Sequence, residues 1–147
     1  MTNNFTFTII KPGAVAHEHI GEILTMVTRA GFWISAMKYL KLNEEQARYF
    51  YSIHQGKPFF EDLIRFMTSG PIVVAILEKE DAVEEYRKLI GNTDPAKAEP
   101  GTIRKLFAES IQRNAVHGSD SNENAVKEAN FFFSLSERFT KSGKFPI

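Results

Sequence analysis

Cysteine is absent from the 147 residues of this sequence, so a disulfide framework and a thiolate metal site are both excluded. Long apolar runs are absent as well. The longest, IVVAIL at 72–77, is far too short to cross a bilayer. The first residues, MTNNFTFTIIKPG, have neither the basic start nor the apolar stretch of a signal peptide. We therefore expect a soluble, cytoplasmic protein without a membrane partner.

Net charge and the usual phosphate-binding motifs are also missing. Eighteen basic and eighteen acidic residues cancel, so no global field attracts nucleic acid, although a local basic pocket is compatible with that balance. We expect no obligatory nucleic-acid partner. Neither G-x-x-x-x-G-K-S/T nor G-x-G-x-x-G occurs. If the protein binds phosphates, separate side chains must hold them.

What is present favours one folded domain over residues 1–147. Apolar residues make up 43% of the sequence and include thirteen phenylalanines, which suffice for a core without disulfide bonds. No internal repeat, low-complexity tract or linker divides the chain. We therefore expect a single domain with a single core.

The spacing of apolar residues predicts four strands, at 5–10, 32–42, 70–79 and, as a short apolar piece, 114–116. The third is apolar on both faces, which predicts full burial. In the second, alternation predicts that one face carries all of the following: Phe32, Ile34, Ala36, Leu40 and Leu42.

Helices are predicted between the strands. One runs over 14–29 and is closed by Gly31, and a second begins at Asn43 as the N-cap, with Gln46 as its capping-box partner. A third has Pro58 in its first turn, and others cover 80–91 and 121–133. Residues 92–105 lack periodicity and predict a long, functional surface loop. The order predicts an α+β sandwich, one sheet with helices packed on it.

Cationic and hydroxyl side chains from separate segments could hold an anion together. Lys11 ends the first strand, Arg87 lies in a helix and Arg104 follows the long loop, which itself contains Thr93 and Thr102. Taken singly, each cation is more often a solvated or salt-bridged surface residue. Jointly they could converge on phosphate, because guanidinium groups match phosphate oxygens bidentately.

His117, in the stretch RNAVHGSDS, has two interpretations. A lone histidine is more often a surface or satisfied core residue. However, Gly118 leaves room for a ligand, and a carboxylate such as Glu128 could hold one ring nitrogen and leave the other free as a nucleophile.

The remaining histidines and aromatics have ordinary interpretations. His17 and His19 point apart on a helix and are not expected to bind metal, and His54 is interpreted as structural. Tyr51 and Phe59 are expected in the core, although an exposed Phe59 could stack on a nucleobase.

Together these segments resemble the nucleoside diphosphate kinase family from Phe5 to about Phe133. The resemblance rests on TIIKPGAV, GKPFF, FMTSGPIVV, NTDPAKAEPGTIR and NAVHGSDS, which occur in the family's order. It implies a ferredoxin-like βαββαβ fold with a four-stranded antiparallel sheet. It also implies a ping-pong reaction that moves a γ-phosphoryl group from a nucleoside triphosphate to a nucleoside diphosphate.

The resemblance also implies a role for each matching residue. His117 matches the histidine phosphorylated on Nδ1, with Ser119 and Glu128 as its supports. The residues around the transferred group match Lys11, Tyr51 and Asn114, and those that grip the outer phosphates match Arg87, Thr93 and Arg104. The cleft for the base, which is bound with little selectivity, matches Phe59, Leu63 and Ile111.

Cofactor and assembly follow from the same resemblance. Mg²⁺ arrives bridging the phosphates of ATP, GTP or another nucleotide and needs no dedicated protein ligands. Family members form hexamers or tetramers. Because Pro95 and Pro100 lie in the loop that resembles the family's trimer contact, we expect a hexamer.

Three local departures and two alternatives accompany this interpretation. Gly13 replaces a common acidic residue or asparagine, Lys105-Leu106 replaces a customary Gly-Asp, and SNENA at 121–125 differs from the commoner sequence. They put loop packing or subunit contacts in doubt rather than the reaction. The alternatives are a nucleotide-binding regulatory module without turnover and a histidine phosphodonor to other proteins.

Overall fold

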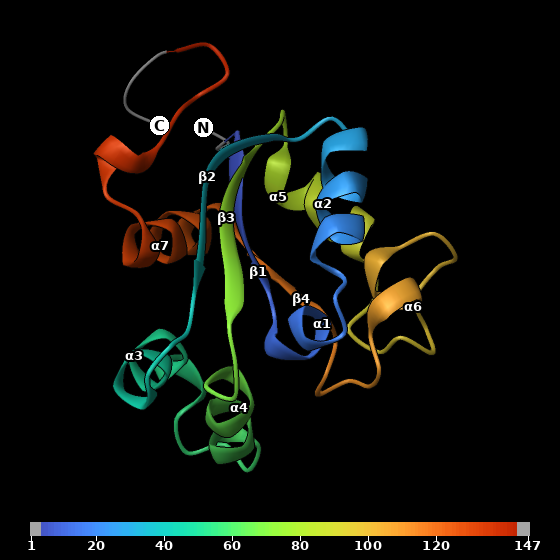
Figure 1. Ribbon diagram of the computed structural model, residues 1–147, viewed down its shortest axis with the longest axis vertical. Helices are drawn as coiled ribbons and strands as arrows, with labels where there is room; N and C mark the ends of the chain where they lie inside the picture. The colour runs from blue at the N-terminus through green and yellow to red at the C-terminus, as the bar shows by residue number, and fades with distance from the viewer. Residues whose placement is uncertain (1–3, 144–147) are drawn as a thin grey trace.

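The computed structural model describes residues 4–143, which form one antiparallel sheet with helices on both faces (Figure 1). The strands are β1 (Phe5–Ile10), β2 (Trp33–Leu40), β3 (Ile72–Glu78) and β4 (Val116–Gly118), in the order β2-β3-β1-β4. The α+β fold predicted from the sequence is therefore confirmed. The fourth strand begins two residues later than predicted.

Seven α-helices and two 3-10 turns connect or follow the strands within the described residues. They are α1 (Pro12–Ala16), α2 (Ile20–Arg29), α3 (Glu44–Phe50), η1 (Ser52–His54), α4 (Phe60–Met67), α5 (Ala82–Ile90), α6 (Ile103–Phe107), α7 (Asn122–Phe132) and η2 (Leu135–Glu137). No helix in the described part of the chain combines the length and apolar character needed to span a membrane.

The sheet separates two apolar layers. Helices α3, α4 and α7 cover one face with residues such as Ala47, Ile64 and Phe132. Helices α1, α2, α5 and α6 cover the other face with residues such as Ile23 and Tyr86. In Figure 1, α7 lies on one side of the sheet and α2 and α5 lie on the opposite side. The site described below uses side chains from both faces.

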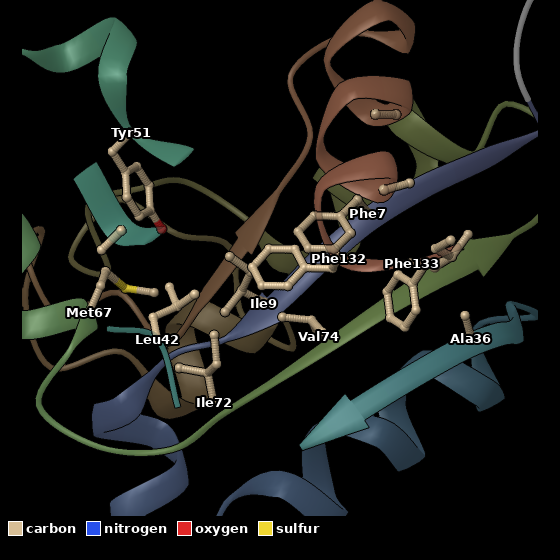
Figure 2. Close-up of a cluster of buried hydrophobic side chains, with 14 of the residues drawn as sticks. Phe7, Ile9, Ala36, Leu42, Tyr51, Met67, Ile72, Val74, Phe132 and Phe133 are labelled. Carbon is tan, nitrogen blue, oxygen red and sulfur yellow. The ribbon is translucent and has the colours of Figure 1, made fainter. Parts of the chain in front are cut away.

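Phenylalanines fill the layer under α7. The rings of Phe7 and Phe132 stack with their centres 5.3 Å apart and an interplanar angle of 9°, an arrangement that Figure 2 shows at the middle of the cluster. Ile9 and Val74 lie beside them on neighbouring strands. This packing makes the β1–β3 pair a rigid base for the short strand β4.

The predicted helix over 14–29 is wrong in one respect, because the chain forms two helices there. Glu18, between α1 and α2, has a φ of 64°, in the left-handed region that ends a helix. Its backbone N–H bonds to the Val15 carbonyl rather than continuing the α-helical pattern. The apolar periodicity of Ile20 to Val27 is confirmed, but α1 turns separately after Lys11.

The prediction that five apolar residues of the second strand share one face is also wrong. Ser35 is an extra residue in the pairing with β3, since Ile34 pairs with Leu77 and Ala36 pairs with Ile76. This bulge reverses the alternation. Phe32 and Ile34 therefore contact the α5 layer, whereas the following residues contact the α7 layer: Ala36, Leu40 and Leu42.

Helix ends agree more closely with the sequence. Asn43 and Gln46 form the predicted capping box, and Gly91 ends α5 with a φ of 84°. Two expectations need correction. Pro58 precedes α4 in a turn, because the helix begins at Phe60. The loop predicted over 92–105 ends at Thr102, whose hydroxyl accepts a hydrogen bond from the Lys105 N–H and caps α6.

Candidate active site

His117 lies in the middle of β4, opposite Ile9 of β1. Its ring faces the α7 side of the sheet, 6.1 Å from the ring centre of Phe7. Nε2 lies 2.9 Å from Oε2 of Glu128, which α7 provides. Since Nε2 lacks an aligned hydrogen bond within the described residues, we interpret this contact as a close polar pair rather than a linear bond. The side chain of His117 is 21% exposed.

Ser119 fixes the carboxylate that faces His117. Its hydroxyl donates to Oε1 of Glu128 at 2.6 Å and accepts from the Phe7 backbone N–H at 3.2 Å. Ser119 is fully buried, so water does not compete for these two hydrogen bonds. Glu128 is thereby oriented with one oxygen on the serine and the other on the histidine.

Lys11 is buried at the end of β1. Its Nζ donates to Oδ1 of Asn114 at 2.8 Å, and its backbone N–H donates to the Ala115 carbonyl at 2.9 Å. Burial, with the charge of Arg104 as a second cause, lowers the pKa of Lys11 from 10.5 to about 7. The charged form of the amine therefore has no negative partner to offset its burial, and a bound anion could supply one.

Arg104 is buried in α6 and bonds to backbone carbonyls. Its guanidinium donates to the carbonyl oxygens of Asn114 at 3.3 Å, Gly91 at 3.0 Å and Val116 at 2.9 Å. Its pKa is lowered to about 10, mainly by burial, while Tyr86 opposes the shift and the charge of Arg87 adds to it. Arg104 therefore ties α5, α6 and β4 together while keeping its positive charge beside Lys11.

A pocket of about 300 Å³ opens beside Arg104. Arg87 and Thr93, which the sequence assigns to the outer phosphates, line it with Arg104. Gly118, the neighbour of His117, also lines the pocket. The pocket thus brings together residues from α5, the loop after it, α6 and the last residue of β4. Such a pocket, rich in guanidinium groups, fits a polyphosphate.

Ala115 leads into β4 in a strained conformation. Its φ is 72°, which is unfavourable for a residue other than glycine. Non-glycine residues in this region persist where surrounding contacts hold them, and they are concentrated at functional sites. Here the Ala115 carbonyl accepts from Lys11 while Asn114 binds the lysine side chain. The strained residue thus aligns Asn114 with Lys11 immediately before His117.

Tyr51 is buried as predicted, but its hydroxyl has no hydrogen-bond partner among residues 4–143. Burial raises the pKa of Tyr51, and the negative charge of Glu128 adds to the rise. The phenol therefore stays protonated, with a donor available for a ligand. Figure 2 shows Tyr51 at one end of the apolar cluster.

The residues expected to bind a base lie farther out. Phe59 is 45% exposed at the start of α4, contrary to the default core expectation. Ile111 is exposed after α6, and Leu63 is half-buried against the core. The guanidinium of Arg113 lies 4.9 Å from the ring centre of Phe66, so the segment that carries Ile111 contacts α4.

His54 was interpreted as structural, but it lies within electrostatic range of the site. Burial lowers its pKa, and the nearby charges of Lys57 and His117 also lower it, whereas Asp120 raises it. Its ring centre is 6.4 Å from that of Tyr51. The three-residue spacing from Tyr51 is the only sequence signal for this placement, and it is weak.

Gly13 and Lys105, which differ from the family's usual residues, make only ordinary local contacts. A Cβ at Gly13 would lie 3.5 Å from the Phe66 ring, an ordinary contact. The amine of Lys105 is 3.4 Å from the Pro95 carbonyl, so it reaches the loop that precedes α6. Neither residue contacts His117, and SNENA supplies the Ser121 cap of α7.

Comparison with known proteins identifies one family along nearly the whole chain. A family model described as nucleoside diphosphate kinase matches residues 4–138. A nucleoside diphosphate kinase of Flavobacterium psychrophilum is 54% identical over 139 residues, which cover 95% of this chain and 100% of the relative.

Solved structures agree in fold. The nucleoside diphosphate kinase of Aquifex aeolicus superposes with a TM-score of 0.90 at 41% identity, covering 92% of this chain and 98% of that one. That of Halobacterium salinarum, in complex with CDP, has a TM-score of 0.88 at 36% identity, covering 94% and 92%.

The ferredoxin-like sheet, with a pocket that two arginines line beside β4, is typical of a nucleotide-handling enzyme of the α+β class. The chain belongs to the nucleoside diphosphate kinase family and is an enzyme of nucleotide metabolism that transfers phosphoryl groups.

Proposed function

We propose that His117 is the nucleophile of a two-step phosphoryl transfer. In the first step its Nδ1 forms a bond to the γ-phosphorus of a nucleoside triphosphate, the bond to the β-phosphate oxygen breaks, and the diphosphate leaves. In the second step the terminal oxygen of another nucleoside diphosphate attacks that phosphorus and the bond to Nδ1 breaks. One site thus serves donor and acceptor in turn.

The single observation that carries this proposal is the support of the ring. Glu128 lies 2.9 Å from Nε2 of His117, and Ser119 orients that carboxylate. A carboxylate on Nε2 favours the proton there and leaves the Nδ1 lone pair free to attack. It also stabilises the positive charge that the ring acquires when it is phosphorylated.

The surrounding groups provide the electrostatic stabilisation that phosphoryl transfer needs. We assign Lys11 and Asn114 to the transferred group, with the Tyr51 hydroxyl, which has no hydrogen-bond partner among residues 4–143, as a further donor. We assign Arg87 and Thr93, which line one pocket with Arg104, to the outer phosphates. Lys11 and Arg104 bond to carbonyl oxygens rather than to carboxylates, so phosphate does not have to displace an internal anion.

The base is proposed to bind between α4 and the segment after α6. Phe59 offers an exposed ring for stacking, and Leu63 and Ile111 add apolar surface. Stacking accepts any nucleobase because every base has a π-face. We therefore expect ATP, GTP and other nucleoside triphosphates, including deoxynucleotides, to be donors.

A divalent metal, which the family implies, fits this site as part of the nucleotide. No three His, Cys, Asp or Glu side chains gather to bind a metal anywhere in residues 4–143, and the pocket is lined by two arginines and no carboxylate. Mg²⁺ bound to the phosphates would neutralise part of their charge. The protein residues then hold the complex through the phosphate oxygens.

Location and assembly are proposed on sequence grounds. We infer a cytoplasmic location from the absence of cysteine. We infer a hexamer because Pro95 and Pro100 lie in the loop before α6 that resembles the family's trimer contact. Analytical ultracentrifugation should give the mass of six chains, and the mass of four would contradict the proposal.

The central experiment follows the phosphoryl group. The purified protein is incubated with γ-labelled ATP and Mg²⁺, and then chased with unlabelled GDP. We expect acid-labile label on His117 that the diphosphate removes as GTP. His117→Ala should accept no label, whereas His17→Ala, at an exposed histidine beside Glu109, should behave like the unmodified protein. Label and turnover that persist in His117→Ala would refute the proposal.

A further inference from the structure

Behind His117, on the opposite face of the sheet, a chain of two hydroxyl groups reaches its backbone. Thr8 pairs with Gly118 across β1 and β4, and its Oγ1 donates to the His117 carbonyl at 2.7 Å. The hydroxyl of Tyr86, from α5, lies 2.7 Å from the same Oγ1. Because threonine has only one hydroxyl hydrogen, the Tyr86 hydroxyl must be the donor to Thr8.

Both hydroxyls are held in place by burial. Tyr86 is fully buried and Thr8 is 2% exposed. The Tyr86 ring meets the ring of Phe32 edge-on, with centres 5.5 Å apart. A water molecule cannot readily replace either partner, so the chain Tyr86–Thr8–His117 carbonyl is a fixed internal link. Burial also raises the pKa of Tyr86 to about 12, which keeps its hydroxyl a donor at physiological pH.

The same tyrosine also packs directly beneath β4. A Cβ added to Gly118 would lie 3.0 Å from Cδ2 of Tyr86 and 3.0 Å from Cδ1 of Ile90. The absence of a side chain at Gly118 thus lets the strand rest on the Tyr86 ring immediately after His117. Ring packing and the hydroxyl chain therefore act on adjacent residues of β4.

These contacts complement those of the imidazole. Glu128 approaches the His117 ring from α7, whereas Thr8 and Tyr86 hold its peptide group from the α5 side. Because β4 is only three residues long, its own ladder gives the nucleophile little restraint. Small errors in the aim of a reacting atom slow a transfer strongly.

We propose that Tyr86 and Thr8 are positioning residues, which aim the nucleophilic nitrogen of His117 by fixing its backbone carbonyl. The inference rests on the proposed role of His117. It assigns no contact with the nucleotide to either hydroxyl. Their effect should therefore fall on the transfer rate and not on nucleotide binding.

The test measures the first half-reaction in single turnover, with rapid quenching and ATP–Mg²⁺ as donor. Thr8→Val should lower the rate constant for labelling of His117 on the order of tenfold, with the half-saturating ATP concentration unchanged. Tyr86→Phe should show a smaller loss, because Thr8 keeps its bond to the carbonyl. The double variant should resemble Thr8→Val, since both changes break one chain.

Two controls separate positioning from general destabilisation. Thr8→Ser keeps the hydroxyl and should keep the rate. Ile23→Val, fully buried in the same layer and distant in sequence from β4, should lower thermal stability without slowing transfer. The proposal is overturned if Thr8→Val transfers at the normal rate, if Ile23→Val slows it equally, or if the loss lies in ATP binding.

The outcome is distinguishable from failure of the proposed function. If His117→Ala still accepts label, the nucleophile itself is misassigned. If label requires His117 but Thr8→Val and Tyr86→Phe react normally, only the positioning role fails. The ¹⁵N shifts of the His117 ring provide a second readout, because a re-aimed ring changes its contact with Glu128. Unchanged shifts in Thr8→Val would also count against the proposal.

Discussion

Lys11 has the most unusual electrostatic environment of the residues assigned to the site. It is buried, its Nζ bonds to an amide oxygen, and the charge of Arg104 is nearby. Burial places its pKa near 7 in the free protein, so the amine is largely neutral at pH 8.5. A bound phosphate would favour the charged form.

We predict that nucleotide binding at pH 8.5 takes up roughly one proton per site through Lys11. Calorimetric titration with ADP–Mg²⁺ in two buffers of different ionisation enthalpy measures this uptake. It should disappear in Lys11→Met and persist in Lys57→Met, at an exposed lysine. Equal proton uptake in Lys11→Met would show that another group titrates.

The same shift gives the pH dependence of stability. The pKa of Lys11 is about 7 in the folded protein and 10.5 in an exposed lysine, so the unfolded chain binds more protons between these values. The free energy of unfolding therefore increases through Lys11 as pH rises from about 7 to 10.5, and Lys11 adds no further pH dependence below 7, where its amine is charged in both states. The unfolding free energy of Lys11→Met should lack this component.

At the scale of elements, Gly91, between α5 and α6, has less room for a side chain than any other glycine of the sequence. Gly91 has a φ of 84°, and a Cβ there would lie 2.6 Å from Oγ1 of Thr102. Thr102 caps α6, which carries Arg104. The end of one helix and the start of the next thus approach closely because Gly91 has no side chain.

We predict that Gly91→Ala lowers the free energy of unfolding by about 2–3 kcal/mol, since it combines overpacking with a left-handed backbone. Gly21→Ala, in α2 with no atom within 4 Å of the new Cβ, should instead raise it by about 0.5–1 kcal/mol. Urea unfolding followed by circular dichroism measures both. An unchanged free energy of unfolding in Gly91→Ala would mean that α6 can shift away from the new methyl group.

At the scale of the whole molecule, Arg104 connects three segments. Its guanidinium bonds to carbonyls that follow α5 and that lie before and within β4. The sequence assigns it only to phosphate binding. In the structure, the same side chain also holds β4 against the α5–α6 junction, so binding and stability are not separable at this residue.

We predict that Arg104→Lys weakens nucleotide binding and also lowers the free energy of unfolding by about 2–4 kcal/mol, because lysine cannot reach all three carbonyls. Arg87→Lys, exposed in the same pocket, should weaken binding with little change in stability. Denaturant unfolding without nucleotide, paired with ADP titration, separates the two effects. An Arg104→Lys protein of normal stability would leave Arg104 with a binding role alone.

The sequence by itself determined the order of the strands and of most helices, and it was the basis for the proposed site residues. Strand and helix periodicity, the Asn43 cap and the Gly91 stop are local, so the residues near each position are enough to predict them. The His117 motif and its companion segments indicate the family without reference to any contact in space. Glu128 was also predictable as the partner of the ring, since it lies on the helix that follows.

Only the tertiary structure decided features that depend on residues distant in sequence. The Ser35 bulge is fixed by pairing with β3. Burial of Lys11 beside Arg104 arises from two segments more than ninety residues apart, as does the contact of Thr8 with the His117 carbonyl. Electrostatic and hydrogen-bond energies depend on distance in space, which local sequence patterns do not contain.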